Sequence, residues 1–395
     1  MKNIDNYRKN SGLNFIEVKK NNRSTVLEIL HSLAPISRAD IASLSGLTRT
    51  TVTNIINELI NVDFIEEVGS KSTKSGRKKT LLKIRKDAFK IIGINISRSN
   101  IKVGLYDTEA NLLYSSSKEF SSDVANKNSI KFLFEIIDSV IKNTGISIEE
   151  INGIGIGIPA PIEFSTGEII ATPSYFEAWK DVNLKDNLEK KYKVKTWVDN
   201  DANVGALGEK WFGQGKHYRD YIFVVSDIGF GSGIVLNGKL HRGDFSMAGE
   251  IGHVILGYKE KRNYLENKSG FKYIINILKE RDENCNIEYI LNKINVEKDE
   301  EFVKYAKEIS RYAGMAIMNL ISIIDPQAVI IGGNLKNISN IAYKEINKII
   351  DENLFGPRRS QILFSNTKED VVLKGAAALV LERIISDPYS YILMH

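Results

Sequence analysis

The sequence predicts a mixed α/β protein of two lobes, preceded by a small helix-turn-helix segment. From residue 91 onward, short apolar runs typical of strands alternate with helical patterns, which favours an α/β architecture. The first ninety residues instead carry closely spaced helical patterns, followed by a basic hairpin. A chain of 395 residues is long enough to form two or three domains.

The composition is that of a soluble globular protein, with 43% hydrophobic and 26% charged residues. The N-terminus lacks the apolar core of a signal peptide. Apolar runs such as 376–381 are far shorter than the roughly 20 residues of a membrane span. The single cysteine, Cys285, excludes an internal disulfide and favours a reducing compartment. We therefore expect a cytoplasmic protein that has no membrane partner.

The net charge of +5 is concentrated in a short segment. Residues 71–90 contain nine Lys and Arg and one acid, Asp87, whereas residues 1–70 are neutral and the rest of the chain carries a net −3. A localised basic stripe is typical of proteins that bind a phosphate backbone, although a lone lysine run is more often a solvated surface. The neighbouring sequence decides between the two interpretations.

Helical patterns precede the basic stripe. Apolar spacing predicts a helix over 22–33, and Ser37 is placed to cap a second helix in which Asp40 occupies the capping-box position. After Gly46, Thr48 caps a third helix with its apolar residues on one side, so the last two helices form a helix-turn-helix. Small hydrogen-bonding side chains at the start of the third helix suit bases and phosphates, and we expect DNA contacts at Thr48, Arg49, Thr50, Thr51, Thr53 and Asn54. An ordinary helical hairpin with a threonine-rich cap is the alternative.

The segment "FIEEVGSKSTKSGRKKTLLKI" reads as a strand, a basic loop and a second strand. Such a hairpin directly after a helix-turn-helix predicts a wing, which favours DNA binding over the ordinary hairpin. We expect wing contacts from Arg77, Lys78 and Lys79, with Arg77 suited to a narrow minor groove because such a groove concentrates negative potential. A double-stranded DNA operator is therefore the expected partner.

The region that follows is predicted from its alternating pattern. "IIGINISRSNIKVGLYD" is a hairpin, and "INGIGIGIPAP" is a buried strand that ends at Pro159. In "KVKTWVDNDANVGALGEKWFG", a strand leads into the corner Asp199-Asn200-Asp201 and then a helix from about Ala202. An α/β domain binds its ligands outside the carboxyl ends of its strands, as this corner would.

Polar side chains in the turns of this region form a candidate ligand site. The residues are Asn200, Asp201, Glu250, His253 and Glu266. Carboxylates accept hydrogen bonds from hydroxyl groups, and the amide and imidazole groups can donate or accept them, so the set suits a polyol. Taken singly, each carboxylate is a helix cap or a surface charge as readily as a ligand, and His253 is a structural histidine as readily as a contact.

The motifs "GIGIGIPAP", "DNDANVGALGE", "AGEIGH", "LENKSG" and "VIIGGNL", in this order after a winged helix-turn-helix, closely resemble the ROK family of bacterial sugar kinases and sugar-responsive repressors. The resemblance runs from about Asn22 to Leu381. It implies a two-lobed actin/hexokinase-like domain that binds a sugar through the five residues of the candidate site. It also implies that Asp201 stands where the kinases keep their general base.

The resemblance divides the chain into four parts. These are an N-terminal arm over 1–21, the winged helix-turn-helix over 22–86, a first lobe over 87–200 that is completed by the C-terminal helix at about 372–395, and a second lobe over 201–371. We expect a homodimer, because a single winged helix reads few base pairs and two-fold proteins read two-fold sites.

The sequence departs from the kinase pattern at both phosphate loops. The first hairpin has lost its acidic residue and its Gly-Gly-Thr turn, and reads Asn95, Ser97, Arg98 and Ser99 instead. The second loop begins with Asp227 and Ile228 where the family has a phosphate-binding Gly-Thr. A carboxylate there repels an anion, so we expect no catalytic residues and no phosphoryl transfer.

The family's structural zinc also lacks its ligands, because the segment from His253 to Glu266 contains no cysteine. We therefore expect no metal or cofactor. The favoured function is a cytoplasmic repressor of carbohydrate-utilisation genes that responds to a monosaccharide, with xylose favoured by likeness to the repressor branch. The alternatives are an ATP-dependent sugar kinase that also binds DNA, and a DNA-binding protein controlled by a protein partner.

Overall fold

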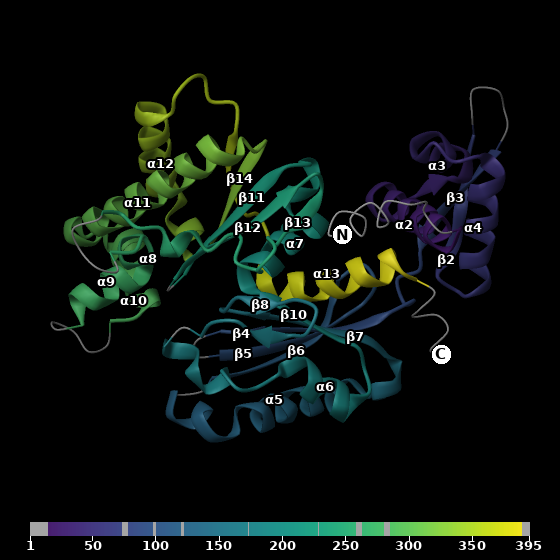
Figure 1. Cartoon of the computed structure of the whole chain (residues 1–395), viewed down its shortest axis with the longest axis horizontal. Helices are drawn as coiled ribbons and strands as arrows, with labels where there is room; N and C mark the ends of the chain where they lie inside the picture. The colour runs from purple at the N-terminus through teal and green to yellow at the C-terminus, as the bar shows by residue number, and fades with distance from the viewer. Residues whose placement is uncertain are drawn as a thin grey trace, which may run out of the picture.

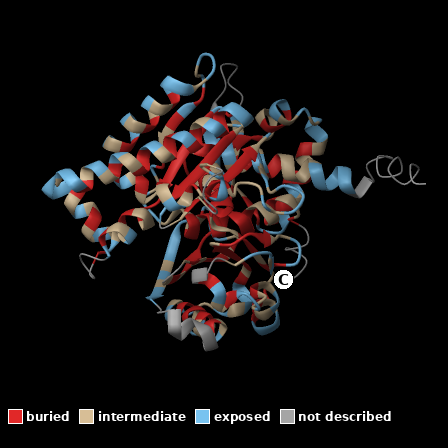
Figure 2. Cartoon of the chain, turned by 60° about the vertical axis from the view of Figure 1, so that its left-hand side comes forward, coloured by how far each residue is buried: buried red, intermediate tan, exposed pale blue. Residues whose placement is uncertain are grey.

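We describe the protein from a computed structural model, in which residues 15–72, 78–97, 100–119, 122–172, 174–227, 229–257, 263–279 and 285–388 are described. The predictions for Arg77, Arg98, Ser99 and Ile228 therefore fall outside the described residues. Figure 1 shows three parts: the N-terminal segment and two lobes, with one long helix, α13, running between the lobes. Buried residues are concentrated in the central strands (Figure 2).

The N-terminal segment is a winged helix-turn-helix. Its elements are α2 (Phe15–Leu33), β1 (Ile36–Ser37), α3 (Arg38–Ser45), α4 (Arg49–Asn61), β2 (Ile65–Ser72) and β3 (Lys78–Ile84), and the three strands form a sheet in the order β1-β3-β2. Ser37 caps α3 by accepting a hydrogen bond from the backbone N–H of Asp40, and Gly46 ends the helix in the left-handed conformation at φ 70°. Thr48 caps α4 as predicted.

The first helix differs from the prediction at its start. It begins at Phe15, whereas the apolar spacing predicts a beginning at Asn22. Residues 15–21 include the apolar Phe15, Ile16 and Val18, but the polar run 19–25 separates them from the helical pattern on which the prediction rests. Lys19 and Lys20 in this first part form ion pairs with Glu58 and Asp387, which tie it to α4 and to the end of α13.

The first lobe is a five-stranded sheet in the order β10-β7-β4-β5-β6. Its elements are β4 (Lys90–Ile96), β5 (Asn100–Tyr106), β6 (Leu112–Glu119), α5 (Ser122–Thr144), η1 (Ile148–Glu150), β7 (Ile151–Ile158), β8 (Ile162–Glu163), β9 (Glu168–Ile169), η2 (Ser174–Trp179), α6 (Leu184–Tyr192) and β10 (Thr196–Asn200). Helices α5 and α6 cover one face of the sheet, and α13 covers the other.

The second lobe repeats this plan with the order β13-β12-β11-β14-β15. Its elements are α7 (Asp201–Phe212), η3 (Gln214–His217), β11 (Tyr221–Ser226), β12 (Phe230–Leu236), β13 (Lys239–His241), η4 (Ile251–His253), α8 (Glu266–Ser269), α9 (Phe271–Leu278), α10 (Ile287–Asn292), η5 (Lys293–Glu297), α11 (Glu300–Ile324), β14 (Ala328–Gly333), η6 (Asn334–Ile338), α12 (Ser339–Asn353) and β15 (Gln361–Phe364). Side chains of β11 alternate, with Ile222 and Val224 facing the α11 side and Phe223 facing α7.

In each lobe the central strand pairs antiparallel with the strand that follows it and parallel with a later strand. The strand β4 pairs antiparallel with β5 and parallel with β7, and β11 pairs antiparallel with β12 and parallel with β14. This repeated plan gives the turns β4–β5 and β11–β12 corresponding places in the two lobes. The two segments in which the sequence departs from the kinase pattern lie at these two turns.

The helix α13 (Val371–Ser386) connects all three parts of the molecule. It packs on β4 and β7 of the first lobe, on α7 of the second lobe and on α2. Glycines let α7 and α13 cross with their backbones in contact: a Cβ atom on Gly375 would lie 2.0 Å from the carbonyl oxygen of Val204, and one on Gly208 would lie 2.7 Å from that of Val371. No side chain larger than hydrogen fits at these two positions without a shift of the helices.

The winged helix-turn-helix shares its hydrophobic core with the first lobe. Val26, Leu27 and Leu30 of α2 belong to the same buried cluster as Leu381 and Ile384 of α13. The apolar side of this segment therefore packs against the first lobe as well as within the segment itself. The pattern of one helix shows that a face is buried, but it does not show which neighbour covers that face. Among the described residues, no helix is both long and apolar enough to cross a bilayer.

Candidate functional site

Two of the residues predicted to bind a ligand, Asn200 and Asp201, lie at the start of α7. Asn200 is the N-cap of this helix, and its side-chain oxygen accepts hydrogen bonds from the backbone N–H groups of Ala202 (2.9 Å) and Asn203 (3.4 Å). The amide group of Asn200 also donates to the carbonyl of Ala160 in the turn after β7 (3.4 Å). Asn200 therefore caps α7, and its amide joins the two strand ends at the site.

Asp201 follows at the helix start, where its carboxylate accepts a hydrogen bond from the backbone of Ala202 (2.8 Å). Burial raises the pKa of Asp201 to about 7, and the negative charges of Asp227 and Glu250 act in the same direction. The structure therefore brings Asp201 and Glu250 within electrostatic range, although the sequence separates them widely. Near neutral pH, the carboxyl of Asp201 can either donate or accept a hydrogen bond.

Glu250 and His253 flank the short helix η4. The Nδ1 atom of His253 lies 3.5 Å from a carboxylate oxygen of Glu250. This contact raises the pKa of His253, and the nearby carboxylate of Glu266 adds to the shift. Glu266 opens α8, and the position of a Cβ atom on Gly229 would lie 3.8 Å from its Oε2 atom. The structure thus places Glu250, His253 and Glu266 in one group beside the β11–β12 turn. His253 is the most exposed of them and also packs edge-on against Tyr264.

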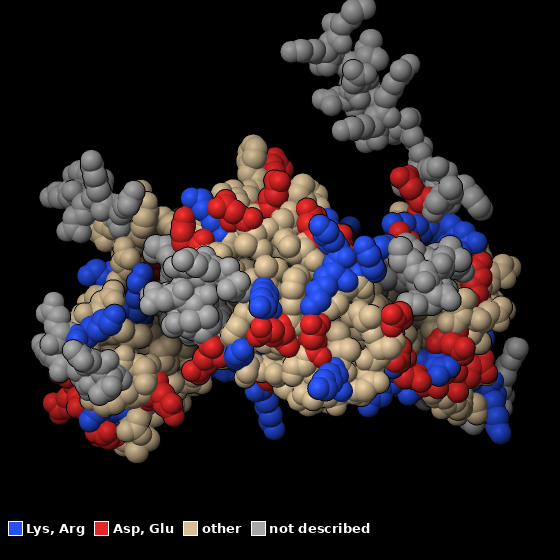
Figure 3. All heavy atoms as spheres, turned by 90° about the horizontal axis from the view of Figure 1, so that it is seen from below, with Lys and Arg blue, Asp and Glu red and all other residues tan. Residues whose placement is uncertain are grey.

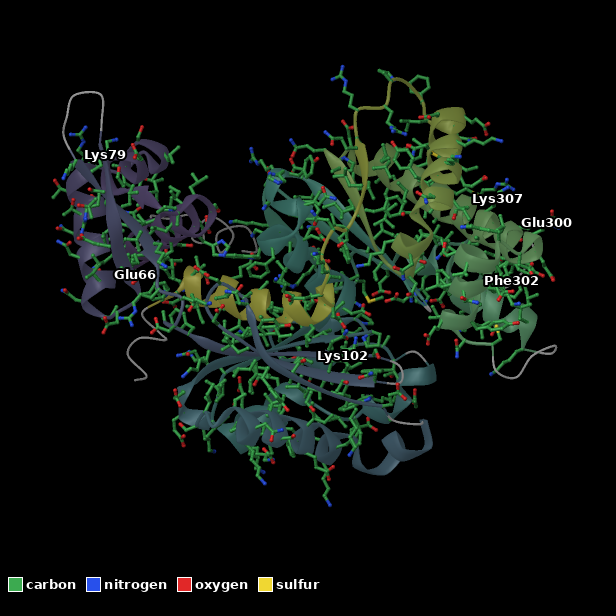
Figure 4. The ribbon with its side chains drawn as sticks, turned by 180° about the vertical axis from the view of Figure 1, so that it is seen from behind. Glu66, Lys79, Lys102, Glu300, Phe302 and Lys307 are labelled. Atoms are coloured by element: carbon green, nitrogen blue, oxygen red, sulfur yellow. The ribbon has the colours of Figure 1, made fainter. Side chains whose placement is uncertain are left out.

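Polar contacts of the chain itself lie on the strands beside the β4–β5 turn. The amide of Asn95 donates to both carboxylate oxygens of Asp370 (3.2 and 3.1 Å), and Lys102 forms an ion pair with Asp370 at 2.9 Å. Asp370 also caps α13 by accepting hydrogen bonds from the backbone of Val372 and Leu373. Figure 4 shows Lys102 near the end of α13 that lies away from the wing. These contacts bind the β4–β5 hairpin to the beginning of α13.

At the β11–β12 turn, a carboxylate of the chain also accepts hydrogen bonds from a neighbouring segment. The Oδ1 atom of Asp227 accepts hydrogen bonds from both the backbone N–H and the side-chain amide of Asn334, each at 2.8 Å. Asn334 follows Gly333, which has a positive φ of 69° and ends the strand β14. A carboxylate of the protein thus takes a backbone N–H group at the glycine turn, where an anionic ligand would otherwise be a suitable acceptor.

An ion pair that the sequence analysis missed lies directly behind the site. Asp199 is buried, with 1% of its surface exposed, and Arg242 contacts its Oδ2 atom through Nε (2.8 Å) and a terminal nitrogen (2.7 Å). The guanidinium of Arg242 also covers the ring of Phe164 at 3.9 Å. The other carboxylate oxygen of Asp199 accepts from the backbone of Asn200 (2.8 Å) and the amide of Asn203 (3.0 Å). The acidic residues of the Asp199-Asn200-Asp201 corner could have suggested a cationic partner, but nothing near them in the sequence indicated Arg242.

The site offers hydrogen-bond acceptors for a neutral polyol. Three carboxylates predicted as ligands, Asp201, Glu250 and Glu266, are accompanied by Asp227, and in this group only His253 can carry a positive charge. Sugar hydroxyl groups donate well to such acceptors, whereas a phosphate would meet repulsion. Within the described ranges, no group of three or more His, Cys, Asp and Glu side chains could hold a metal ion. The family's zinc does not fit His253, because the segment from His253 to Glu266 contains no cysteine.

The start of α4 presents the predicted DNA-reading residues, although not all equally. Thr48, Arg49, Thr50 and Asn54 are exposed, whereas Thr51 and Thr53 are partly buried. The Thr48 hydroxyl is also engaged as the helix cap, accepting from the backbone of Thr51 (3.1 Å) and lying 2.8 Å from its hydroxyl. Arg49, Thr50 and Asn54 are therefore the predicted residues with side chains available to a groove.

The wing strands place two of the three predicted basic contacts. Lys78 is exposed, and Lys79 forms an ion pair with Asp40 of α3 at 2.8 Å. Figure 4 labels Lys79 at the base of the wing, beside the helix-turn-helix. Asp40 therefore supports the wing, in addition to accepting a hydrogen bond from the Ser37 hydroxyl at 2.6 Å. On the face in Figure 3, basic and acidic side chains are interspersed over the lobes, as the near balance of charge beyond residue 90 leads one to expect.

Comparisons with known proteins show the family and the fold to which this chain is similar. The family model described as "ROK family" matches residues 91–383. A xylose repressor from Caldicellulosiruptor bescii is 29% identical over 392 residues, covering 94% of this chain and 98% of the relative. The structure of a ROK family transcriptional regulator, a homologue of the Escherichia coli MLC protein, has a TM-score of 0.80 at 22% identity and covers 96% of this chain and all of the other. A ROK glucokinase from Streptomyces griseus, solved with glucose and AMPPNP, has a TM-score of 0.63 at 23% identity, covering 73% of this chain and 98% of its own.

Proposed function

The chain belongs to the ROK family, and we propose that it is a sugar-responsive transcriptional repressor that binds an operator through its winged helix-turn-helix. The observation that carries this proposal is the share of the chain that a repressor covers, compared with the share that a kinase covers. The xylose repressor matches 94% of the chain, whereas the glucokinase structure covers 73% of it. The likeness to the repressor thus includes the winged helix-turn-helix as well as the two lobes.

We further propose that the protein is a sensor without phosphoryl-transfer activity. Phosphoryl transfer rests on positioning the phosphoryl group and stabilising its negative charge. In this chain, Asp370 accepts from Asn95 and Lys102 at the first turn, and Asp227 accepts from Asn334 at the second. These internal acceptors use the donors that a nucleotide would need, so the retained site serves ligand recognition.

A sugar kinase remains the second candidate because of one observation. The pKa of about 7 at Asp201 suits a general base that removes a proton from a sugar hydroxyl near neutral pH. A coupled assay with ATP, Mg²⁺ and a panel of monosaccharides separates the two functions. Phosphorylation of any sugar at enzymatic rates would overturn the proposal, whereas the repressor requires only that a sugar changes operator affinity.

The proposed function is tested directly by operator binding in the presence of sugars. DNA selected in vitro with the full-length protein supplies the operator, and we expect two-fold symmetric sequences because we propose a homodimer. Xylose is the first sugar to test, followed by glucose and N-acetylglucosamine. We expect one sugar to change operator affinity about 5- to 150-fold. Absence of any response across the panel would contradict a sugar-responsive repressor.

The wing should contribute a salt-dependent part of DNA binding. Each phosphate contact adds roughly 0.9 to the slope of log affinity against log salt. We expect Lys78→Ala to lower this slope by about one unit, because Lys78 is exposed. Lys79→Ala should lower it less, because Lys79 is already paired with Asp40. Fluorescence anisotropy with labelled operator across a salt series measures both slopes.

The matched control for the wing is Lys190→Ala. Lys190 is exposed in the last turn of α6, in the first lobe. The Lys190→Ala substitution removes the same charge from the chain, so a general effect of net charge would lower the salt slopes of Lys78→Ala and Lys190→Ala alike. Equal slopes for Lys78→Ala and the unmodified protein would exclude Lys78 as a phosphate contact.

A further inference from the structure

One helix joins the candidate ligand site to the DNA-binding segment. Helix α7 begins with the predicted ligand residues Asn200 and Asp201, and its last turn carries Trp211 and Phe212. At 1.5 Å per residue, Trp211 lies about 15 Å along the helix from Asp201. The ring of Trp211 meets the ring of His31 on α2 edge-to-face, with centroids 4.3 Å apart and an interplanar angle of 72°.

The contact is built around a neutral imidazole. The ring of Phe212 also meets His31, at 6.1 Å and 70°. Burial and, to a smaller extent, the positive charge of Lys210 together lower the pKa of His31 to about 4. Charged groups also tie the adjoining elements, among them the pairs Lys210–Glu382 on α7 and α13 (2.7 Å), Lys374–Glu369 at the start of α13 (3.4 Å) and Lys20–Asp387 between α2 and the end of α13 (2.8 Å). His31 thus acts at neutral pH as an aromatic surface for α7 and not as a charge.

Helix α7 is also fixed along its length. It packs on β11 and β12 of the second lobe, and it crosses α13 with direct backbone contact at Gly208 and Gly375. A helix held in this way moves as a rigid element, so a displacement of its first turn reaches its last turn. The helix α2 shares a buried core with α13 and the first lobe, and Trp211 and Phe212 at the end of α7 pack against that core. The His31 contact therefore lies where an element of the second lobe meets the DNA-binding segment.

We infer that the contact between His31 and the Trp211–Phe212 pair transmits the state of the sugar site to the DNA-binding segment. This inference rests on the proposed function, because it assigns the route by which a sugar changes operator affinity. A ligand shifts an equilibrium only by its different affinity for two states. The two states differ here in the position of α7 against α2, and the ligand selects between them at Asn200 and Asp201.

The test compares variants that remove the contact from either side. Trp211→Leu and His31→Leu each replace a ring with an apolar side chain that lacks one. Trp211→Phe keeps a ring that can restore the contact. Without sugar, we expect hydrogen exchange of the amides of residues 27–33 to rise about 2- to 10-fold in the leucine variants, as loss of an aromatic pair implies, with little change in Trp211→Phe. Unchanged exchange in both leucine variants would overturn the inference.

The decisive measurement is the ratio of operator affinities with and without the active sugar. We expect this ratio to fall to about 2 or less in Trp211→Leu and His31→Leu, while sugar affinity changes less than about threefold. The control Lys20→Met removes a different contact between α2 and the end of α13, the ion pair of Lys20 with Asp387, and should keep the full ratio. Leucine variants with the ratio of the unmodified protein, or an equal loss in Lys20→Met, would overturn the inference. An unmodified protein that responds to no sugar would instead defeat the proposed function.

Discussion

Replacing Arg242 with methionine is expected to destabilise the protein by about 3–5 kcal/mol, because it leaves a buried carboxylate without its cation. Asp199 has 1% of its surface exposed and receives two contacts from the guanidinium, at 2.8 and 2.7 Å. Arg242 also covers the ring of Phe164. Water cannot replace these contacts at so buried a carboxylate. Guanidinium chloride unfolding measures the effect as a lower midpoint.

The control for this prediction is Lys180→Met. Lys180 also pairs with a carboxylate, that of Glu177 at 3.1 Å, but both side chains are more than half exposed. Pairs of this kind contribute little to stability, so the unfolding midpoint should not move. A similar midpoint for Arg242→Met and the unmodified protein would show that Asp199 does not depend on Arg242.

A double variant separates loss of the pair from loss of packing. In Asp199→Asn/Arg242→Met the buried charge is absent, so the protein should regain part of the stability lost in Arg242→Met. The amide of Asn at position 199 can still accept from the backbone of Asn200, which preserves the start of α7. A double variant less stable than Arg242→Met would mean that the methionine variant lost packing rather than charge compensation.

Local features of this fold were predictable from the sequence because their causes are local. Ser37 and Thr48 cap helices α3 and α4 through their own hydroxyl groups, and the hairpin from Ile91 to Asp107 follows from alternating apolar residues around a polar turn. The predicted ligand residues Asp201, Glu250, His253 and Glu266 do come together, since each lies at or beside a helix terminus near the ends of the central strands.

The missed features depend on residues that are distant in the sequence. Arg242 is 43 positions from Asp199, and Lys102 is 268 positions from Asp370. No periodicity relates such partners, because only the packing of two lobes brings them together. His31 illustrates the same point: within the pattern of α2 it resembles a surface residue near a helix end, and its burial comes from α7.

Replacing Asp201 with asparagine should leave operator binding intact but raise the sugar concentration needed for the response roughly 10- to 100-fold. The substitution keeps the shape of the side chain and removes a charged acceptor, and a hydrogen bond to a charged group contributes about 1.5–3 kcal/mol. Titration of the operator complex with the active sugar measures the shift. Operator release by Asp201→Asn at the sugar concentration that suffices for the unmodified protein would exclude Asp201 as a sugar contact.

The pH dependence of sugar binding distinguishes loss of this charge from a change of shape. The pKa of Asp201 is raised to about 7, so the carboxylate is mostly protonated at pH 6 and mostly ionised at pH 8. If the ionised form accepts from a sugar hydroxyl, sugar affinity should be about tenfold lower at pH 6 than at pH 8. Asparagine does not titrate, so the variant should lack this change, and any remaining pH dependence would report His253, whose pKa is also raised.

Calorimetry from pH 6 to pH 8 measures this dependence. The same pH dependence of sugar affinity in both proteins would show that the sugar does not sense the charge of Asp201. In a kinase, the same variant would bind sugar almost normally and lose turnover, because the base and not the acceptor would be missing.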